Sequence, residues 1–547
     1  MTRMTGAEAL IATIKQAGIE VVFGIPGVQI MDAVDALYRD GSIRWISPRH
    51  EQTAAYMAFG YARTTGKIGT AMVLPGPGAL NTTAAIGTAY ARSVPVLLIS
   101  GQIESSLIGY HQGVLHEFDE QLDVFRCLTK WCKRAMKPEE IPLFTREALR
   151  QLQKGRPRPV ELEVPYDLWS KETDMYLLPI DPAPRLFPDP ATIRKGVEIL
   201  REARRPLIIA GGGAANADMK KEITELAEFF NAPVLMTAEG QGCIDINHPL
   251  YAGNFTLWLH PVIKEADVIL VIGSRLRASG NTRLELREDQ KIIQIDHDSD
   301  ELGRVHRIQL GINADAGLAI QALLKECSGD CRSTWRPEEL AAMRQKVRRK
   351  LEKAGPLQMS IVDTLHKVLP EDAILVPDIT NMGYWCDIAY PVNRTRSYVD
   401  SSYFGTLGYA FPTSLGAKVG NPDKPVVAIC GDGGFPYASP ELATAVQEGI
   451  NVIVIIFADN LYGTVTGMQK RLYGGRFVGN RLLNPDYVKF TESFGAIGEK
   501  LSSPGELAGA LSRALEASKP VVIECPVPQM DTPWEALIDD GLWFRED

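Results

Sequence analysis

The sequence predicts an α/β protein made of three doubly wound domains, each built on a parallel β-sheet. Short apolar runs that end at glycine or at an acidic residue alternate with amphipathic stretches along the chain. This alternation is typical of parallel strands joined by helices. The chain has 547 residues, which is too long for one ordinary domain and suits three.

Two changes in composition mark the expected domain boundaries. Residues 171–190 contain five prolines, which is typical of a linker. Residues 328–356 are polar and basic and are predicted to form a connecting helix. The expected domains are therefore residues 1–170, a middle domain of residues 191–327, and residues 357–547.

The first two domains are expected to follow the same strand–helix alternation. A helix over residues 5–18 should begin at Thr5, with Glu8 completing a capping box. Further helices are predicted through Ala36 and Leu37, over residues 52–66 and from Pro77. The strands are predicted at 21–27, 45–48, 70–76, 94–102 and 155–165 in the first domain, and at 207–213, 232–238, 268–276 and 291–298 in the middle domain.

The third domain is expected to place two acidic residues at one edge of its sheet. Strands are predicted at 373–380, 426–430 and 452–457, with a helix that begins at Ser439 as N-cap and Pro440 as first residue. Parallel strands joined by a helix end at the same edge of the sheet, where ligands of open α/β sheets bind. Asp432 and Asp459 should therefore lie side by side.

Two neighbouring carboxylates at a glycine-rich turn indicate a divalent cation. Mg²⁺ prefers six oxygen ligands and usually takes one or two carboxylates together with substrate phosphates. Gly431, Gly433 and Gly434 allow the backbone to approach a phosphate and to offer N–H donors. Gly-Asp-Gly alone would be an ordinary turn, but the following helix, strand and second acid favour a Mg²⁺–diphosphate site.

This pattern resembles the signature of thiamine diphosphate enzymes. The second acid follows the first by 459 − 432 = 27 residues, as that signature requires, and the resemblance is closest to the acetolactate synthase-like group. It implies thiamine diphosphate and Mg²⁺ as cofactors, with Asp432, Asp459 and the carbonyl of Leu461 as metal ligands. The family usually carries asparagine at the second position, and Asp459 keeps an oxygen donor there.

The resemblance also implies a catalytic role for Glu51. Taken alone, an acid at the start of a helix is more simply explained by its interaction with the helix dipole. The segment His-Glu-Gln before AAYMAFGYAR, however, is similar to the family segment that carries the activating glutamate. Glu51 is then expected to bind N1′ of the aminopyrimidine, which leads to the C2 ylid and, after decarboxylation of the donor, to an enamine.

Further cofactor contacts are implied by the same resemblance. The carbonyl of Gly405 should accept from the 4′-amino group, and Leu407 should hold the cofactor in a V shape. Without the resemblance, Leu407 would be interpreted as core packing. The other predicted cofactor-binding residues are Pro26, Thr380, Asn381, Tyr462 and Gly463. From the residues themselves, Asp378-Ile379-Thr380-Asn381 at the end of the strand over 373–380 is a set able to hydrogen-bond a diphosphate.

The substrate pocket is predicted from four residues, Gln29, Gln112, His116 and Met468. His116-Glu117 stands where the synthases carry Gln-Glu, and an imidazole can shuttle protons near neutral pH. His116 is therefore a candidate catalytic residue, with a solvated loop histidine as the alternative. Gly467-Met468 stands where the synthases carry Gln-Trp, so the aromatic wall of their acceptor pocket is absent.

The middle domain is expected to bind no FAD. Flavin-binding members of the family differ from this chain at residues 252–261 and at Ala278-Ser279. Gly211-Gly212-Gly213 follows a predicted strand but lacks the full G-x-G-x-x-G spacing of a dinucleotide site.

Composition excludes several other classes of function. The net charge of −9 argues against nucleic acid and anionic membranes as partners, and no apolar run reaches the length of a membrane span. The N-terminus lacks the apolar core of a signal peptide, and the eight scattered cysteines suit free thiols in the cytoplasm. The resemblance implies a homodimer or a dimer of dimers, with Glu51 reaching the partner's cofactor.

The predicted function is that of a thiamine diphosphate- and Mg²⁺-dependent carboligase or decarboxylase. Its substrates would be a 2-oxo acid and a carbonyl acceptor. One alternative is a lyase that cleaves a C–C bond in a 2-hydroxyacyl-CoA or a diketone. Another is a non-catalytic homologue that binds the cofactor, against which Glu51, Asp432 and Asp459 argue.

Overall fold

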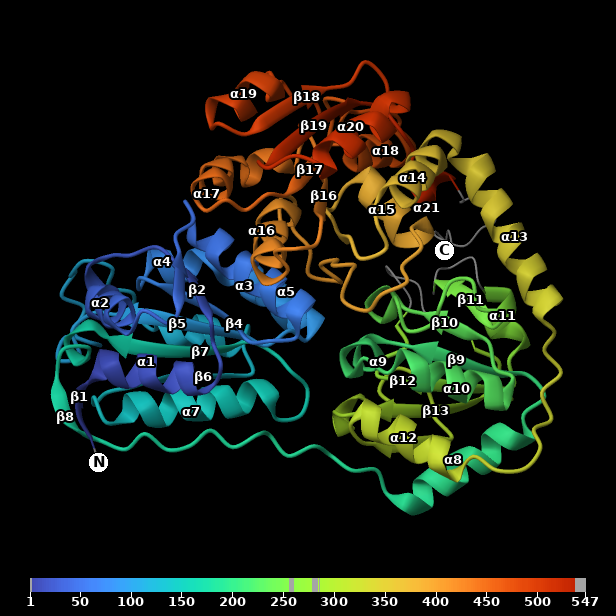
Figure 1. Ribbon diagram of the computed structural model, residues 1–547, viewed down its shortest axis with the longest axis horizontal. Helices are drawn as coiled ribbons and strands as arrows, with labels where there is room; N and C mark the ends of the chain where they lie inside the picture. The colour runs from blue at the N-terminus through green and yellow to red at the C-terminus, as the bar shows by residue number, and fades with distance from the viewer. Residues whose placement is uncertain (1, 255–259, 278–283, 285, 537–547) are drawn as a thin grey trace.

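The computed structural model describes residues 2–254, 260–277, 284 and 286–536. Figure 1 shows three α/β domains, with the N-terminal and middle domains below and the C-terminal domain above them. Each domain contains a sheet whose strands are all parallel, which confirms the predicted fold class. Within the described residues, no helix combines the length and apolar character needed to cross a bilayer.

The N-terminal domain is built on a sheet in the order β3-β2-β4-β5-β7-β6. Helices α1, α2 and α7 pack on one face and α3 and α5 on the other. The strands are β2 (Val21–Gly24), β3 (Arg44–Ile46), β4 (Gly69–Val73), β5 (Val96–Gln102), β6 (Trp131–Arg134) and β7 (Val160–Pro165). The helices are α1 (Gly6–Gln16), α2 (Met31–Asp40), α3 (Glu51–Thr65), α4 (Pro77–Asn81), α5 (Thr83–Arg92), α6 (Gln121–Arg126) and α7 (Glu140–Gln153).

The first helix begins as the sequence predicts. The Thr5 hydroxyl accepts from Glu8 N, and the Glu8 carboxylate accepts from Thr5 N, which completes the capping box. A small antiparallel pair, β1 (Thr2–Thr5) with β8 (Glu172–Met175), was not predicted. Strand β8 lies in the proline-rich stretch expected to be a linker, and residues 176–189 after it form neither helix nor strand.

The middle domain has the sheet order β11-β10-β9-β12-β13-β14, so the chain begins near the centre and fills one side before the other. Its strands are β9 (Pro206–Ala210), β10 (Val234–Met236), β11 (Tyr251–Asn254), β12 (Val268–Ile272), β13 (Lys291–Asp296) and β14 (Leu310–Asn313). Its helices are α8 (Pro190–Glu202), α9 (Gly212–Ala217), α10 (Lys220–Phe230), α11 (His260–Glu265) and α12 (Ala316–Glu326). Helix α13 (Pro337–Ala354) connects it to the C-terminal domain (Figure 1).

The C-terminal domain has the sheet order β15-β16-β17-β19-β18. Its strands are β15 (Ile374–Pro377), β16 (Val426–Gly431), β17 (Ile453–Ala458), β18 (Ile497–Lys500) and β19 (Val521–Pro526). Its helices are α14 (Pro356–Val368), α15 (Asn381–Ala389), α16 (Ala410–Gly420), α17 (Leu442–Gln447), α18 (Gly463–Leu472), α19 (Tyr487–Ser493), α20 (Leu507–Leu515) and α21 (Pro533–Ala536).

The predicted serine cap in this domain is wrong. Two 3-10 turns, Phe435–Tyr437 and Ser439–Glu441, precede α17, so Ser439 lies inside a turn. Its hydroxyl donates to the carbonyl of Pro436 rather than accepting from a helix N–H. Glu441 N donates to Ala438 O at 3.0 Å, so the chain forms a 3-10 turn here and the regular helix α17 begins only at Leu442.

The three domains are joined by buried contacts. Helices α3 and α16 pack so closely that a Cβ on Gly60 or Gly416 would collide with the backbone of the other helix. Arg92, whose side chain is 1% exposed, lies 3.0 Å from Glu239 of the middle domain and 3.2 Å from Asp400 of the C-terminal domain. Removing one member of a buried ion pair leaves an unpaired charge, so this cluster fixes how the domains meet.

Candidate functional site

The ends of β16 and β17 bring Asp432 and Asp459 together. Gly431 lies opposite Phe457 in the parallel register, so both aspartates follow neighbouring strand ends. The backbone N–H of Asn460 donates to Asp432 Oδ2 at 2.7 Å, and Leu461 N donates to Asp459 Oδ1 at 3.0 Å. The two carboxylates therefore face one small region at the carboxyl edge of the sheet.

The electrostatics of this pair suit a cation. Burial raises the pKa of Asp432, which is 2% exposed. Burial and the neighbouring Asp432 charge raise the pKa of Asp459 to about 6. Neither carboxylate has an ion-pair partner among the described residues. Two partly desolvated acids without a positive partner, together with carbonyl oxygens, form a donor set that fits Mg²⁺.

The glycine turn beside the aspartates leaves no room for side chains. A Cβ on Gly431 would lie 2.7 Å from Thr380 Oγ1, and one on Gly433 would lie 2.6 Å from the Tyr462 ring. A Cβ on Gly434 would lie 2.9 Å from Asp378 Oδ2. The turn is therefore held against these side chains and can present its backbone N–H groups to a phosphate.

The loop after β17 is fixed by a second segment of chain. Tyr462 N donates to Asn480 O at 2.8 Å, and Leu482 N donates to Asn460 O at 2.9 Å. Asn460 has a left-handed backbone, with φ of 58°. This pairing holds Leu461 and Tyr462 beside Asp459, and Gly463 then opens helix α18. Met468 is exposed on that helix.

Two site residues were missed by the sequence analysis. Asn484 Nδ2 donates to Asp432 Oδ2 at 2.8 Å, and the Tyr487 hydroxyl donates to Asp432 O at 3.0 Å. Both residues hold Asp432 in place from a segment that follows helix α18 in the sequence. Residues 484–486, Asn-Pro-Asp, precede helix α19 and are typical of a turn, but they do not indicate that Asn484 contacts Asp432.

A buried carboxylate connects the glycine turn to the loop that carries Gly405 and Leu407. Asp378, at the end of β15, accepts from Ile379 N at 2.8 Å and from Gly408 N at 3.0 Å. Gly408 has φ of 79°, which favours glycine. Asp378 was predicted as a possible diphosphate ligand, but it is 3% exposed and hydrogen-bonds the protein backbone instead.

Thr380 and Asn381 lie at the start of α15, next to this carboxylate. Asn381 is the first residue of the helix, and Thr380 is its N-cap without a side-chain capping bond. Asn381 Nδ2 donates to Met530 O at 2.7 Å, whereas its Oδ1 is buried with no hydrogen-bond partner among the described atoms. Thr380 therefore lies against Gly431 of the glycine turn, and the Asn381 oxygen is available to a ligand from the next position of the chain.

The titration of Asp378 should appear in the stability of the protein. Burial raises the pKa of Asp378 to about 7. A carboxyl whose pKa is raised on folding stabilises the fold fully below its unfolded pKa of about 4, and this contribution is lost as the pH rises through 7. We expect the free energy of unfolding of the wild type to fall between pH 5 and 8, relative to Asp378→Asn, by at most about 1.4 kcal/mol per pH unit.

Urea unfolding at several pH values measures this difference, and the Asn variant controls for all other titrating groups. Parallel pH profiles in the two proteins would show that Asp378 keeps its charge throughout this range.

Glu51 lies in the N-terminal domain, at the first position of α3. The preceding His50 is the N-cap, and its ring accepts from Gln52 N. Asn81 Nδ2 of α4 donates to Glu51 Oε2 at 3.0 Å, and a Cβ on Gly78 would lie 3.6 Å from Oε1. The carboxylate is half-buried against the start of α4.

His116 and Gln29 contact each other in the N-terminal domain. The His116 ring Nδ1 lies 3.2 Å from Gln29 Oε1, and Gln29 Nε2 donates to Leu115 O at 3.3 Å. His116 has φ of 68°, which is uncommon outside glycine and frequent at functional sites. Pro26 is exposed just before Gln29. Gln112 is exposed, and its side chain donates to Tyr110 O within its own loop.

The predicted residues thus form two separate groups. One group surrounds Asp432 and Asp459 in the C-terminal domain, and the other surrounds Glu51 and His116 in the N-terminal domain. Within the part of the chain that the structure describes, no hydrogen bond joins the Glu51 carboxylate to the first group.

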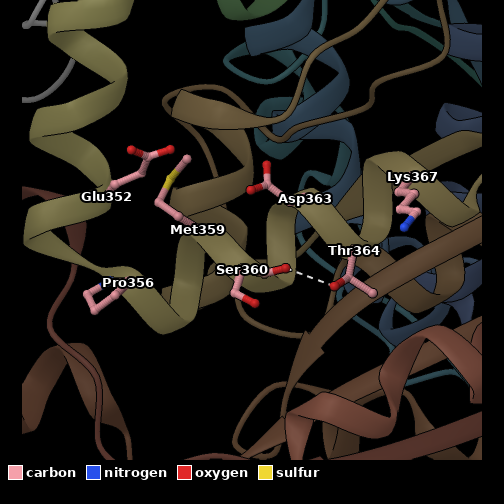
Figure 2. A pocket seen from close by; sticks show the side chains of 7 residues that line it. All are labelled: Glu352, Pro356, Met359, Ser360, Asp363, Thr364 and Lys367. Carbon is pink, nitrogen blue, oxygen red and sulfur yellow. Dashed lines mark hydrogen bonds between the residues drawn. The ribbon is translucent and has the colours of Figure 1, made fainter.

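A surface hollow lies away from both groups. It has a volume of about 390 Å³ and lies between α13 and α14, lined by Glu352, Pro356, Met359, Ser360, Asp363, Thr364 and Lys367 (Figure 2). None of the predicted site residues lines it.

Comparisons with known proteins agree along the whole chain. Three family models match: the N-terminal TPP binding domain of thiamine pyrophosphate enzymes at residues 4–124, the central domain at 193–323 and the C-terminal TPP binding domain at 378–525. A probable acetolactate synthase large subunit of Methanocaldococcus jannaschii is 34% identical over 98% of this chain and 93% of its own.

Two further relatives are named for different reactions, one as a synthase and one as a decarboxylase. The acetolactate synthase large subunit of Corynebacterium glutamicum is 32% identical, covering 97% of this chain and 88% of its own. A probable 2-ketoarginine decarboxylase of Pseudomonas aeruginosa is 34% identical, covering 84% and 82%. With these domains and relatives, the chain belongs to the thiamine pyrophosphate enzymes and is a thiamine diphosphate-dependent enzyme similar to acetolactate synthase large subunits.

Proposed function

We propose that this protein is a thiamine diphosphate- and Mg²⁺-dependent carboligase or decarboxylase of a 2-oxo acid. The observation that carries the proposal is the pair of desolvated carboxylates, Asp432 and Asp459, at neighbouring strand ends beside a glycine turn. When bound, the cofactor supplies a nucleophilic carbon, C2 of its thiazolium ring, and accepts the electron pair that decarboxylation releases.

The residues of the chain would divide the work between the two domains. Asp432, Asp459 and the Leu461 carbonyl would hold Mg²⁺, while Gly433, Gly434, Thr380 and Asn381 would bind the diphosphate. Gly405 and Leu407 would orient the aminopyrimidine, and Pro26, Tyr462 and Gly463 would complete the contacts to the cofactor. Glu51 would hold the proton on N1′, and His116 with Gln29 would move protons at the substrate.

Product analysis tests the proposed reaction. The apoprotein is loaded with Mg²⁺ and thiamine diphosphate and given pyruvate, 2-oxobutyrate or 2-ketoarginine, alone and in pairs. The last substrate is included because one relative is named a decarboxylase of it. A carboligase joins two pyruvate molecules to a 2-hydroxy-3-oxo acid and releases one CO₂, whereas a simple decarboxylase releases acetaldehyde and CO₂. Absence of turnover with every 2-oxo acid, despite saturation with cofactor, would contradict the proposal.

We further propose that the active site is shared between two copies of the chain. Large apolar side chains are exposed near both groups of site residues. They are Met31, Leu115 and Phe118 in the N-terminal domain, and Val465, Met468 and Leu472 on α18 in the C-terminal domain. Exposed apolar surface of this kind is typical of an interface. A homodimer, or a dimer of dimers, would place Glu51 of one subunit at the metal site of the other.

Complementation between two inactive variants tests this arrangement. Glu51→Gln and Asp432→Ala chains are co-expressed with different tags, and the mixed dimers are purified. If the site is shared, a mixed dimer has one doubly altered site and one intact site, so the purified mixed dimers recover about half of the wild-type sites. If each chain forms its own site, the mixed dimers stay inactive.

We expect no flavin in the middle domain. Residues 255–259 and Ala278-Ser279, on which the prediction partly depends, lie outside the described residues. Support comes from the glycine turn after β9: a Cβ on Gly212 would lie 3.4 Å from Glu239 Oε2, so a carboxylate faces the turn that would receive a diphosphate. A cytoplasmic location and the lack of nucleic-acid partners remain predictions; all eight cysteines are free thiols.

A further inference from the structure

Gln121 is a buried amide that the proposed reaction does not use. It is the first residue of α6, directly after the loop that carries His116, and its side chain is 0% exposed. Its Oε1 accepts from Gly76 N at 2.8 Å. Its Nε2 lies 2.9 Å from Glu163 Oε2, 3.1 Å from Ser100 Oγ and 3.2 Å from Gly101 O.

Gly76, whose N–H donates to Gln121, contacts the His116 loop and also begins helix α4. Gly76 has φ of 57°, and a Cβ there would lie 2.7 Å from His116 O. Gly76 is also the N-cap of α4, the helix whose Asn81 donates to the Glu51 carboxylate. A movement of the Gly76 turn would therefore displace both the His116 backbone and the partner of Glu51.

The Gln121 amide is held between Gly76, at its oxygen, and Glu163, at its nitrogen. The Glu163 carboxylate, on β7, accepts from Arg134 Nε and from Gln102 Nε2 at 3.0 Å. Burial raises the pKa of both Glu161 and Glu163, and the Arg134 guanidinium, which contacts Glu163, opposes this rise. The backbone N–H of Gly76 can only donate, so it requires the amide oxygen of Gln121, and the NH₂ group is left to donate to Glu163.

We propose that Gln121 is a positioning residue for the activating glutamate. It ties the His116 loop to the Gly76 turn, so that α4 holds Glu51 in its reactive position. This inference rests on the proposed function of Glu51. It predicts an effect on turnover rather than on cofactor affinity, because the metal and diphosphate ligands belong to the C-terminal domain.

The test compares Gln121→Met with Gln102→Met. Both substitutions keep volume and remove a buried amide bonded to Glu163, but only the first removes the bond to Gly76. We expect Gln121→Met to lower kcat about 10- to 100-fold, the loss that follows displacement of a reacting group by about 1 Å. The KM and the Kd for Mg²⁺–thiamine diphosphate, from fluorescence titration, should change less than about threefold, as should kcat in Gln102→Met.

Hydrogen exchange supplies a readout that needs no turnover. In the holoprotein, the peptide covering residues 74–82 should take up deuterium faster in Gln121→Met than in either the wild type or Gln102→Met. Equal losses of kcat in the two variants, or unchanged exchange in this peptide, would overturn the inference. An inactive wild type would instead refute the proposed function and leave the exchange comparison informative.

Gln121→Glu serves as a rescue variant and as a second test if the methionine variant does not fold. A protonated glutamic acid can accept from Gly76 N and donate to Glu163, whereas an ionised one is repelled by that carboxylate. Glu161 and Glu163 oppose its ionisation, and Arg134 favours it. We expect kcat of this variant, relative to the wild type, to rise at least threefold from pH 8 to pH 6. A constant ratio would count against the inference.

Discussion

Replacing Glu51 by glutamine should lower kcat on the order of 10²- to 10⁴-fold while leaving cofactor binding nearly intact. Glutamine keeps the shape of the side chain and its place at the start of α3, but it cannot hold or share the proton that the ring N1′ requires. The proposed Mg²⁺ and diphosphate ligands lie in the C-terminal domain, so the affinity for the cofactor should stay nearly constant while kcat falls. The direct measurement is exchange of the C2 proton of the bound cofactor, by NMR after quenching in deuterated buffer.

The hydrogen-bond partner of Glu51 provides a graded comparison. Asn81→Ala removes only the donor to Glu51 Oε2, at 3.0 Å, and should lower the exchange rate by about tenfold or less. Unchanged C2 exchange in Glu51→Gln would remove this carboxylate from the reaction. Loss of cofactor affinity in that variant would give it a binding role instead.

Replacing Asp432 by alanine should abolish binding of Mg²⁺ and of the cofactor together. Asp432 is 2% exposed and is held by Asn460, Asn484 and Tyr487, so no other described side chain can take its place without rearrangement. Without the cation, the diphosphate charge would lie opposite Asp459 uncompensated. We expect the Kd for thiamine diphosphate to rise at least about 100-fold, measured by titration at fixed Mg²⁺.

Asp459→Asn is the matched comparison for this prediction. Asparagine retains an oxygen ligand and removes the charge that repels Asp432, and it is the residue that the family usually carries at this position. Cofactor affinity should therefore fall less than about tenfold. Similar affinities for the wild type and Asp432→Ala, with Mg²⁺ still required, would place the metal elsewhere.

Much of the fold could be predicted because buried parallel strands are continuous apolar runs. β16 and β17 are of this kind, and their ends are marked by glycine and aspartate. Edge strands carry no such signal. β6 has the sequence WCKR and β18 has IGEK, and both were missed because one side of each is open and half of their residues are charged. The interior strand β19, VVIECP, was missed as well, although it is buried.

The site shows the same limit. Asp432 and Asp459 could be paired from sequence because the topology of one strand–helix–strand unit decides their distance. The contacts of Asn484 with Asp432 and of Gln121 with Gly76 could not be predicted from the sequence, because tertiary packing decides where these two segments lie. Asp378 was placed at the right strand end, but its burial, which turns it toward the backbone of Gly408, was not visible in the sequence.

The central claim is that a cation between Asp432 and Asp459 holds the diphosphate of the cofactor. Anomalous diffraction from crystals grown with Mn²⁺ and thiamine diphosphate tests it most directly, since Mn²⁺ accepts the same oxygen ligands as Mg²⁺. We predict one strong anomalous peak about 2.1 Å from an oxygen of each aspartate, with the diphosphate completing its coordination. A peak elsewhere, or a diphosphate bound in another crevice while these carboxylates stay free of metal, would contradict the account.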